Sequence, residues 1–234
     1  MNDSTKPFGH PWLEIATLLA MIAALGAVFL YVPTERSMGE VQRIFYFHLP
    51  SAFMAFAAFF AVFVASALYL WRERRVYDRI AATAAEIGVL FCTLVLVTGP
   101  LWAKPVWNVW WTWDSRLTTT LILWLMYLGY LMIRKYGDAR SSRFAAVIGI
   151  VAFLDVPIIH MSVRWWRTLH PEPVFLAREG VGAGMEPEMV RGLLVCFAAF
   201  TLLTLTLWVR RFSVERASED VESLRIEIRE SRES

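Results

Sequence analysis

The sequence predicts an all-α integral membrane protein, a six-transmembrane-helix bundle with a tryptophan-rich surface outside the cytoplasm. Three observations support this fold class. Hydrophobic residues make up 57% of the 234 residues and charged residues only 19%, which is too apolar for an ordinary soluble domain. The apolar residues form separate runs, and mean hydropathy is +0.48. The tryptophans gather at one end of these runs.

Each predicted span is an apolar run of about the 17 to 25 residues that cross a bilayer. The first run lacks a charged signal-peptide start and a cleavage pattern, so we expect it to remain as a span. The fifth is short and carries Asp155 and Pro157 near its end. The runs cover residues 12–32, 49–71, 80–102, 117–133, 144–160 and 190–209.

Positive charges predict the orientation. The short loops RERRVYDR and RKYGDARSSR are rich in arginine, and Arg210 and Arg211 follow the last run. Because such regions stay in the cytoplasm, both termini are expected there. We therefore expect a membrane domain over residues 1–211 and a charged tail, a solvated helix or a disordered end, over 212–234. The outer loops would be 33–48, 103–116 and 161–189.

Composition argues against two other classes. A net charge of +2, with basic residues in short scattered clusters, does not favour nucleic-acid binding. Cys92 and Cys196 lie far apart within apolar runs, without metal-ligand or redox spacing. They are therefore interpreted as small buried residues.

The eleven tryptophans are unevenly distributed between the two predicted faces. Trp12, Trp71 and Trp208 mark the inner side. Trp124 lies within a span, and the outer side has seven, namely Trp102, Trp107, Trp110, Trp111, Trp113, Trp165 and Trp166. This excess favours a surface for a flat apolar partner over the alternative, a thick interfacial belt.

The densest stretch is WAKPVWNVWWTWDSRL. Trp107, Trp110, Trp111 and Asp114 follow the spacing i, i+3, i+4, i+7, which predicts one stripe of a helix. Asp114 stands just before the fourth span. A helix cap and a place in a binding site are compatible roles for it.

Three of the four histidines are predicted on the same outer side. His48 ends the first outer loop, with a helical spacing of apolar residues before it, and His160 and His170 flank MSVRWWRTL. A single histidine at a membrane edge is usually an interfacial hydrogen-bonding residue. Three beside an aromatic surface indicate a metal or haem ligand, since haem iron takes histidine.

A porphyrin also has a flat apolar face for indoles and two carboxylates for arginines. Arg164, Arg167 and Arg178 lie in the third outer loop. They are candidates for the carboxylate partners, and solubility of the loop is the alternative explanation for each.

Several motifs resemble one family. WNVWWTWDSRLT is similar to the signature of WWD-domain haem-handling proteins. FYFHLP, VTGPLWAKPVW and VPIIHMSVRWWRTLH resemble the haem exporter C family of cytochrome c maturation. These motifs follow the expected order from the first to the sixth predicted span.

The resemblance implies a multi-pass protein of the bacterial inner membrane that binds haem b transiently at its periplasmic face. His48 and His170 would be the axial iron ligands and His160 a supporting residue. We expect the macrocycle to be covered by Trp107, Trp110, Trp111 and Trp113, with Asp114, Arg164 and Arg167 nearby.

The resemblance also implies a carrier and not an enzyme, because the chain is too short for the relatives that attach haem covalently. Haem would pass to the periplasmic haem chaperone, maturation protein E, for c-type cytochrome biogenesis. An ATP-binding cassette pair, maturation proteins A and B, and a small single-span subunit, maturation protein D, would assist its release. Membrane lipid would surround the spans.

Two other function classes stay open at this level. A b-type cytochrome would hold haem between spans, but no predicted span has a histidine at mid-membrane depth. An ion or solute transporter would use ionisable residues within spans. Glu86 and Asp155 are candidates, yet they are offset in depth, so we expect each to make local hydrogen bonds.

Overall fold

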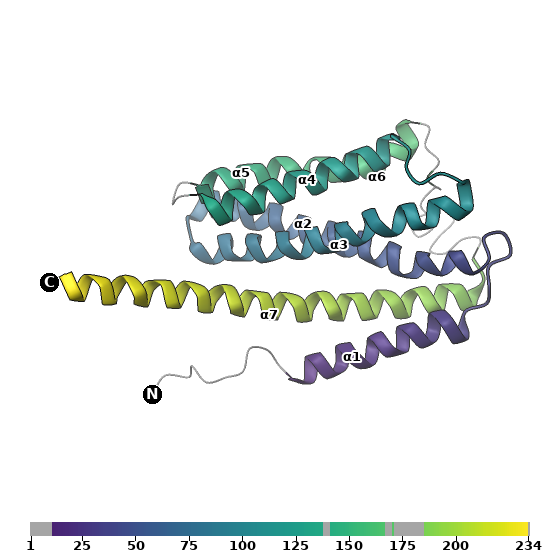
Figure 1. Ribbon diagram of the computed structural model, residues 1–234, viewed down its shortest axis with the longest axis horizontal. Coiled ribbons are helices and arrows are strands. Elements are labelled where there is room, and N and C mark those ends of the chain that lie inside the picture. The colour runs from purple at the N-terminus through teal and green to yellow at the C-terminus, as the bar shows by residue number, and fades with distance from the viewer. Residues whose placement is uncertain (1–10, 138–140, 167–169, 171–184, 234) are drawn as a thin grey trace.

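The computed structural model describes residues 11–137, 141–166, 170 and 185–233, and every regular element within those ranges is helical (Figure 1). Six helical segments there are long and apolar enough to cross a membrane. The all-α membrane fold is thus confirmed. The elements are α1 (Pro11–Gly26) with a π-helical turn (Ala27–Tyr31), a 3-10 turn (Glu40–Ile44), α2 (Phe45–Arg72), α3 (Arg75–Trp107), α4 (Ser115–Tyr136), α5 (Ser141–Phe153), α6 (Asp155–Trp165) and α7 (Pro187–Glu233).

The helices lie side by side in one bundle (Figure 1). α2 and α3 form its centre, α7 and α1 lie along one side, and α4, α5 and α6 cover the other. Polar side chains join α1 to α7, where the hydroxyls of Thr17 and Thr206 are 2.7 Å apart. Tyr127 joins α4 to α5 by donating to the carbonyl of Gly149 at 3.1 Å.

Three helix boundaries differ from the apolar runs. The helix that includes α2 begins with the 3-10 turn at Glu40, so His48 lies near the start of a helix and not at the end of a loop. The fifth span is interrupted at Leu154, between α5 and α6. The charged tail continues α7, whose 47 residues extend about 70 Å, more than twice a hydrocarbon core of about 30 Å.

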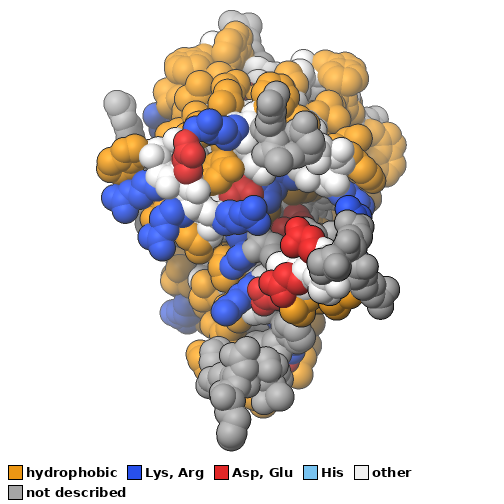
Figure 2. All heavy atoms as spheres, turned by 90° about the vertical axis from the view of Figure 1, so that its left-hand side faces the viewer, with side chains coloured by type: hydrophobic (Ala, Val, Ile, Leu, Met, Phe, Trp, Pro, Cys, Tyr) orange, Lys and Arg blue, Asp and Glu red, His pale blue; other side chains and the backbone are white. Residues whose placement is uncertain are grey.

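Arginines gather at the end of the bundle that includes the α2–α3 turn (Figure 2). Ion pairs join helices there. Arg134 on α4 pairs with Asp78 on α3, and Arg211 on α7 pairs with Glu86 on α3. Glu86 therefore makes an interhelical ion pair in place of the expected local hydrogen bonds. The buried Oδ2 of Asp155 has no hydrogen-bond partner among the described residues.

Candidate functional site

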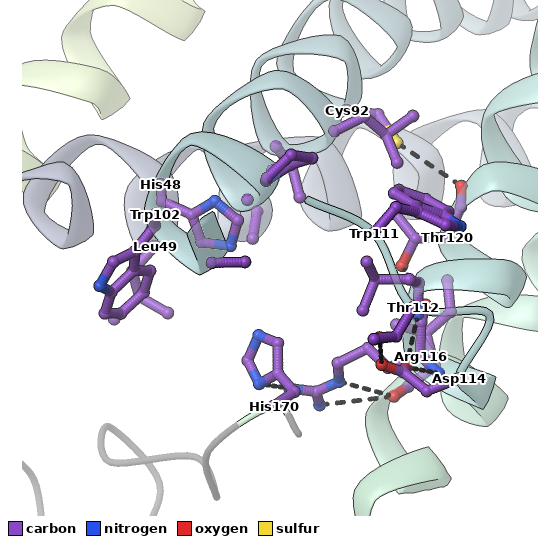
Figure 3. Close-up of a pocket in the computed structure, with 18 of the residues that line it drawn as sticks. His48, Leu49, Cys92, Trp102, Trp111, Thr112, Asp114, Arg116, Thr120 and His170 are labelled. Atoms are coloured by element: carbon purple, nitrogen blue, oxygen red, sulfur yellow. Dashed lines mark hydrogen bonds between the residues drawn. The ribbon is translucent and has the colours of Figure 1, made fainter. Parts of the chain in front are cut away.

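A pocket of about 250 Å³ opens at the other end of the bundle. It lies between the first turns of α2, the last turns of α3, the start of α4 and the middle of α6. Most of its lining is apolar and aromatic. His48 and His170 project into it from different walls (Figure 3).

His48 is held in place by neighbours on α3. Its Nδ1 lies 2.8 Å from the hydroxyl of Thr98, and its ring meets the edge of Trp102 with centroids 6.0 Å apart. Gly99 lies against the same ring, because a Cβ there would be 3.6 Å from His48 Cε1. The imidazole is thus fixed by contacts on both sides and points toward the open centre of the pocket (Figure 3).

His170 lies on the opposite wall, beside the start of α4 (Figure 3). Nη1 of Arg116 is 3.0 Å from its Nδ1. The same guanidinium reaches the carbonyl of Ile159 at 3.4 Å and that of His160 at 3.5 Å. Arg116 therefore connects α4, the middle of α6 and His170.

The tryptophan-rich stretch is not the helical stripe that its spacing predicts. α3 ends at Trp107, Asn108 has a left-handed backbone with φ of 58°, and residues 108–114 form a non-helical connection. Lys104 stabilises this end, since its Nζ donates to Asn108 Oδ1 at 2.9 Å. The helical prediction was wrong because the chain stops the helix at Asn108. The connection nevertheless brings Trp107, Trp110 and Trp111 to the pocket.

Trp113 occupies a different place from the other three. It is 76% exposed and does not line the pocket, but its ring meets the edge of Trp111 at a centroid distance of 5.7 Å. Trp165 and Trp166 are also exposed and lie outside the lining. The pocket thus uses part of the outer tryptophan set.

Asp114 caps α4, and its second carboxylate oxygen closes the connection before it. Oδ1 accepts hydrogen bonds from the backbone of Arg116 at 3.0 Å and of Leu117 at 3.1 Å. Oδ2 accepts from Thr112 at 2.7 Å. Asp114 also lines the pocket, so the cap and the site coincide at one residue.

Of the other predicted site residues, one lines the pocket, one lies outside the lining, and two lie outside the described residues. His160 lines the pocket, near the carbonyl that Arg116 contacts. Arg164 is exposed on α6 and lies outside the lining. Arg167 and Arg178 lie outside the described residues.

Thr98 and Arg116 were not predicted as site residues. Arg116 could have been found, because it lies two positions after Asp114 in the motif WNVWWTWDSRLT. Thr98 carries no comparable signal. Its role depends on the packing of α3 against α2, which no local pattern specifies.

The pocket suits an apolar ligand with a few polar groups. The indole N–H groups of Trp102 and Trp111 are buried without a hydrogen-bond acceptor among the described residues. The part of the chain that the structure describes holds no cluster of three or more metal-ligating side chains. The lining offers apolar rings together with imidazole and indole nitrogens.

Comparison with known proteins gives a consistent assignment. The model of the family described as "Heme exporter protein C" matches residues 5–227. The protein of that name from Bradyrhizobium diazoefficiens is 37% identical over 219 residues, 92% of this chain and 82% of the relative. The Escherichia coli protein of the same name is 32% identical, over 86% of this chain and 81% of its own length.

A relative from Marchantia polymorpha, named "Putative cytochrome c biosynthesis ccmC-like mitochondrial protein", is 36% identical over 74% of this chain and 72% of its own length. The match thus extends over bacterial and organellar proteins. The family model covers almost the whole chain, including every helix that lines the pocket. The chain belongs to the heme exporter protein C family.

Proposed function

We propose that this protein binds haem b in the pocket at the periplasmic face of the bacterial inner membrane and presents it to the periplasmic haem chaperone. The observation that carries the proposal is that His48 and His170, from distant parts of the chain, line one aromatic pocket. Two axial imidazoles would complete the coordination of an iron that already has four porphyrin nitrogens.

The aromatic lining supports the same ligand. Indole rings can cover the apolar macrocycle, and Trp107, Trp110 and Trp111 all face the pocket. Trp113 would contribute through its contact with Trp111. Arg164, at the exposed end of α6, and Arg167 beyond it are proposed partners for the haem carboxylates.

Haem must also leave, which requires ligands that exchange readily. His48 lies in the first turn of α2 and His170 lies after the end of α6, so both lie at the end of the bundle where the pocket opens. Asp114 and His160 support the walls that hold these ligands. The chain would make no covalent bond to haem and would act as a carrier.

The partners and the membrane orientation that we propose follow from the family to which the chain belongs. The names of the relatives describe heme export and cytochrome c biosynthesis. For this chain we propose delivery to maturation protein E, with release driven by maturation proteins A and B and aided by D. Both termini would be cytoplasmic, which places the arginine-rich end inside and the pocket outside.

Haem transfer tests the proposal. The protein is purified from haem-replete cells and mixed with the soluble domain of the periplasmic haem chaperone, and the two are then separated and their visible spectra recorded. We expect haem to move to the chaperone from the unaltered protein. Trp71→Ala, at the arginine-rich end, is the matched control and should transfer equally. A preparation without haem, or haem that stays bound after mixing, would contradict the proposal.

A further inference from the structure

The hydrogen bond of His48 determines which of its two ring nitrogens carries the hydrogen and which keeps a lone pair. A threonine hydroxyl has one hydrogen. The hydroxyl oxygen of Thr98 lies 2.6 Å from the carbonyl oxygen of Leu94 and donates its hydrogen there. It must therefore accept from His48 Nδ1, at 2.8 Å. His48 then carries its hydrogen on Nδ1, and Nε2 is unprotonated and ready to bind a metal.

The hydrogen bond of His170 has the opposite consequence. A guanidinium only donates hydrogen bonds. Because Nη1 of Arg116 lies 3.0 Å from His170 Nδ1, Nδ1 is the acceptor. A neutral His170 in this contact therefore carries its hydrogen on Nε2, and that nitrogen has no lone pair for a metal.

We infer that the two histidines are prepared unequally: Thr98 presets His48 as the first ligand, and Arg116 withholds His170 until a carboxylate of the substrate takes its guanidinium. This inference rests on the proposed function and adds an order of events to it. Thr98 and Arg116 are positioning residues, since each acts through a histidine.

The exchange at Arg116 is chemically balanced. A carboxylate accepts from Nη1 in place of His170 Nδ1, and charge-assisted pairs of this kind are the stronger ones. Solvent water takes the proton from His170 Nε2 and donates one to Nδ1, so the ring stays neutral and no net proton is released. Contacts of Arg116 with the carbonyls of Ile159 and His160 keep the guanidinium at the pocket wall.

Porphyrins with and without free carboxylates test this order in the unaltered full-length protein. Ferric protoporphyrin IX should give a six-coordinate, low-spin spectrum, because its carboxylates release His170. Its dimethyl ester should give a five-coordinate spectrum with one imidazole. A six-coordinate, low-spin spectrum of two imidazoles with both porphyrins would overturn the inference.

Zinc protoporphyrin takes one axial ligand, so it identifies which histidine is ready. With the zinc dimethyl ester, His170→Ala should keep axial coordination and His48→Ala should lose it. With the free-acid zinc porphyrin, His48→Ala should regain coordination through His170. The reverse dependence on the two histidines would overturn the inference. Loss of axial coordination in the unaltered protein with every porphyrin would instead refute the proposed function itself.

Thr98 is tested by removing its hydroxyl without changing its shape. Loss of a partner of this type weakens metal affinity on the order of 10- to 100-fold, and we expect such a loss for the iron dimethyl ester in Thr98→Val. Thr98→Ser should restore most of the affinity. Thr201→Val is the matched control, because that exposed hydroxyl bonds to the carbonyl of Phe197 on its own helix. Equal affinity in Thr98→Val and the unaltered protein, or equal weakening by Val and Ser, would overturn the role of Thr98.

Discussion

Phe59 on α2 and Tyr127 on α4 stack face to face, with ring centroids 3.9 Å apart and planes inclined by 8°. Both side chains are completely buried. Gly88 on α3 lies against the Phe59 ring, where an added Cβ would overlap it. This contact joins three helices that also form walls of the pocket.

Gly88→Ala should destabilise the bundle by about 1 to 3 kcal/mol, because the methyl group forces the Phe59 ring out of its stack. Gly129→Ala on α4 is the matched control. An added Cβ there meets no atom within 4 Å, so it should be neutral or stabilising by up to about 1 kcal/mol. Thermal unfolding in detergent measures both. Equal stability of the two variants would contradict this packing.

Asp114→Ala should cost about 1 kcal/mol through loss of the α4 cap. It also removes the acceptor of the Thr112 hydroxyl, so the tryptophan-bearing connection should loosen and haem should bind more weakly. Asp114→Asn keeps a capping oxygen and should lie between the alanine variant and the unaltered protein. Unfolding and haem titration together measure the two effects. Stability and affinity that both remain unchanged in the alanine variant would contradict the assignment.

Trp111→Ala should weaken haem binding more than Trp113→Ala. The first removes a ring that lines the pocket, whereas the second removes a ring that is 76% exposed outside it. An aromatic contact contributes about 1 kcal/mol, or roughly fivefold in affinity, beyond area burial. Haem titration of both variants supplies the comparison, and a larger loss at Trp113 would show that haem lies elsewhere.

Glu86→Gln should lower stability by at most about 1 kcal/mol and leave haem binding unchanged. Its ion pair with Arg211 is about a third exposed, with side-chain values of 34% and 35%, and exposed pairs contribute little. Glu73→Gln, in the more exposed pair with Arg143, should have almost no effect. If Glu86→Gln abolished haem delivery in cells while stability was kept, an ion-coupled transport role would be favoured instead.

The sequence predicts the membrane fold well because the bilayer imposes a minimum length and apolarity on each span. Boundaries were less accurate. Hydropathy detects the part of a helix that crosses hydrocarbon, but α7 continues through a charged tail and the helix with His48 begins at Glu40. Outside the bilayer, backbone hydrogen bonds extend a helix without any apolar signal.

The pocket brings together several of the residues that the sequence predicts for the site. His48, His160, Trp107, Trp110, Trp111, Asp114 and His170 line the pocket. Trp113 does not line it, because the chain leaves helical geometry after Asn108. Arg164 does not line it either, because it lies exposed in the last turn of α6. Thr98 could not be predicted, since only the packing of α3 against α2 brings its hydroxyl to His48.

The spectrum of bound haem in single-histidine variants tests the central claim most directly. Haem in the unaltered protein should be six-coordinate, whereas His48→Ala and His170→Ala should each yield five-coordinate haem that added imidazole converts back. His160→Ala should stay six-coordinate. Resonance Raman and visible absorption distinguish these states. Six-coordinate haem at full occupancy in both His48→Ala and His170→Ala, without added imidazole, would contradict the account.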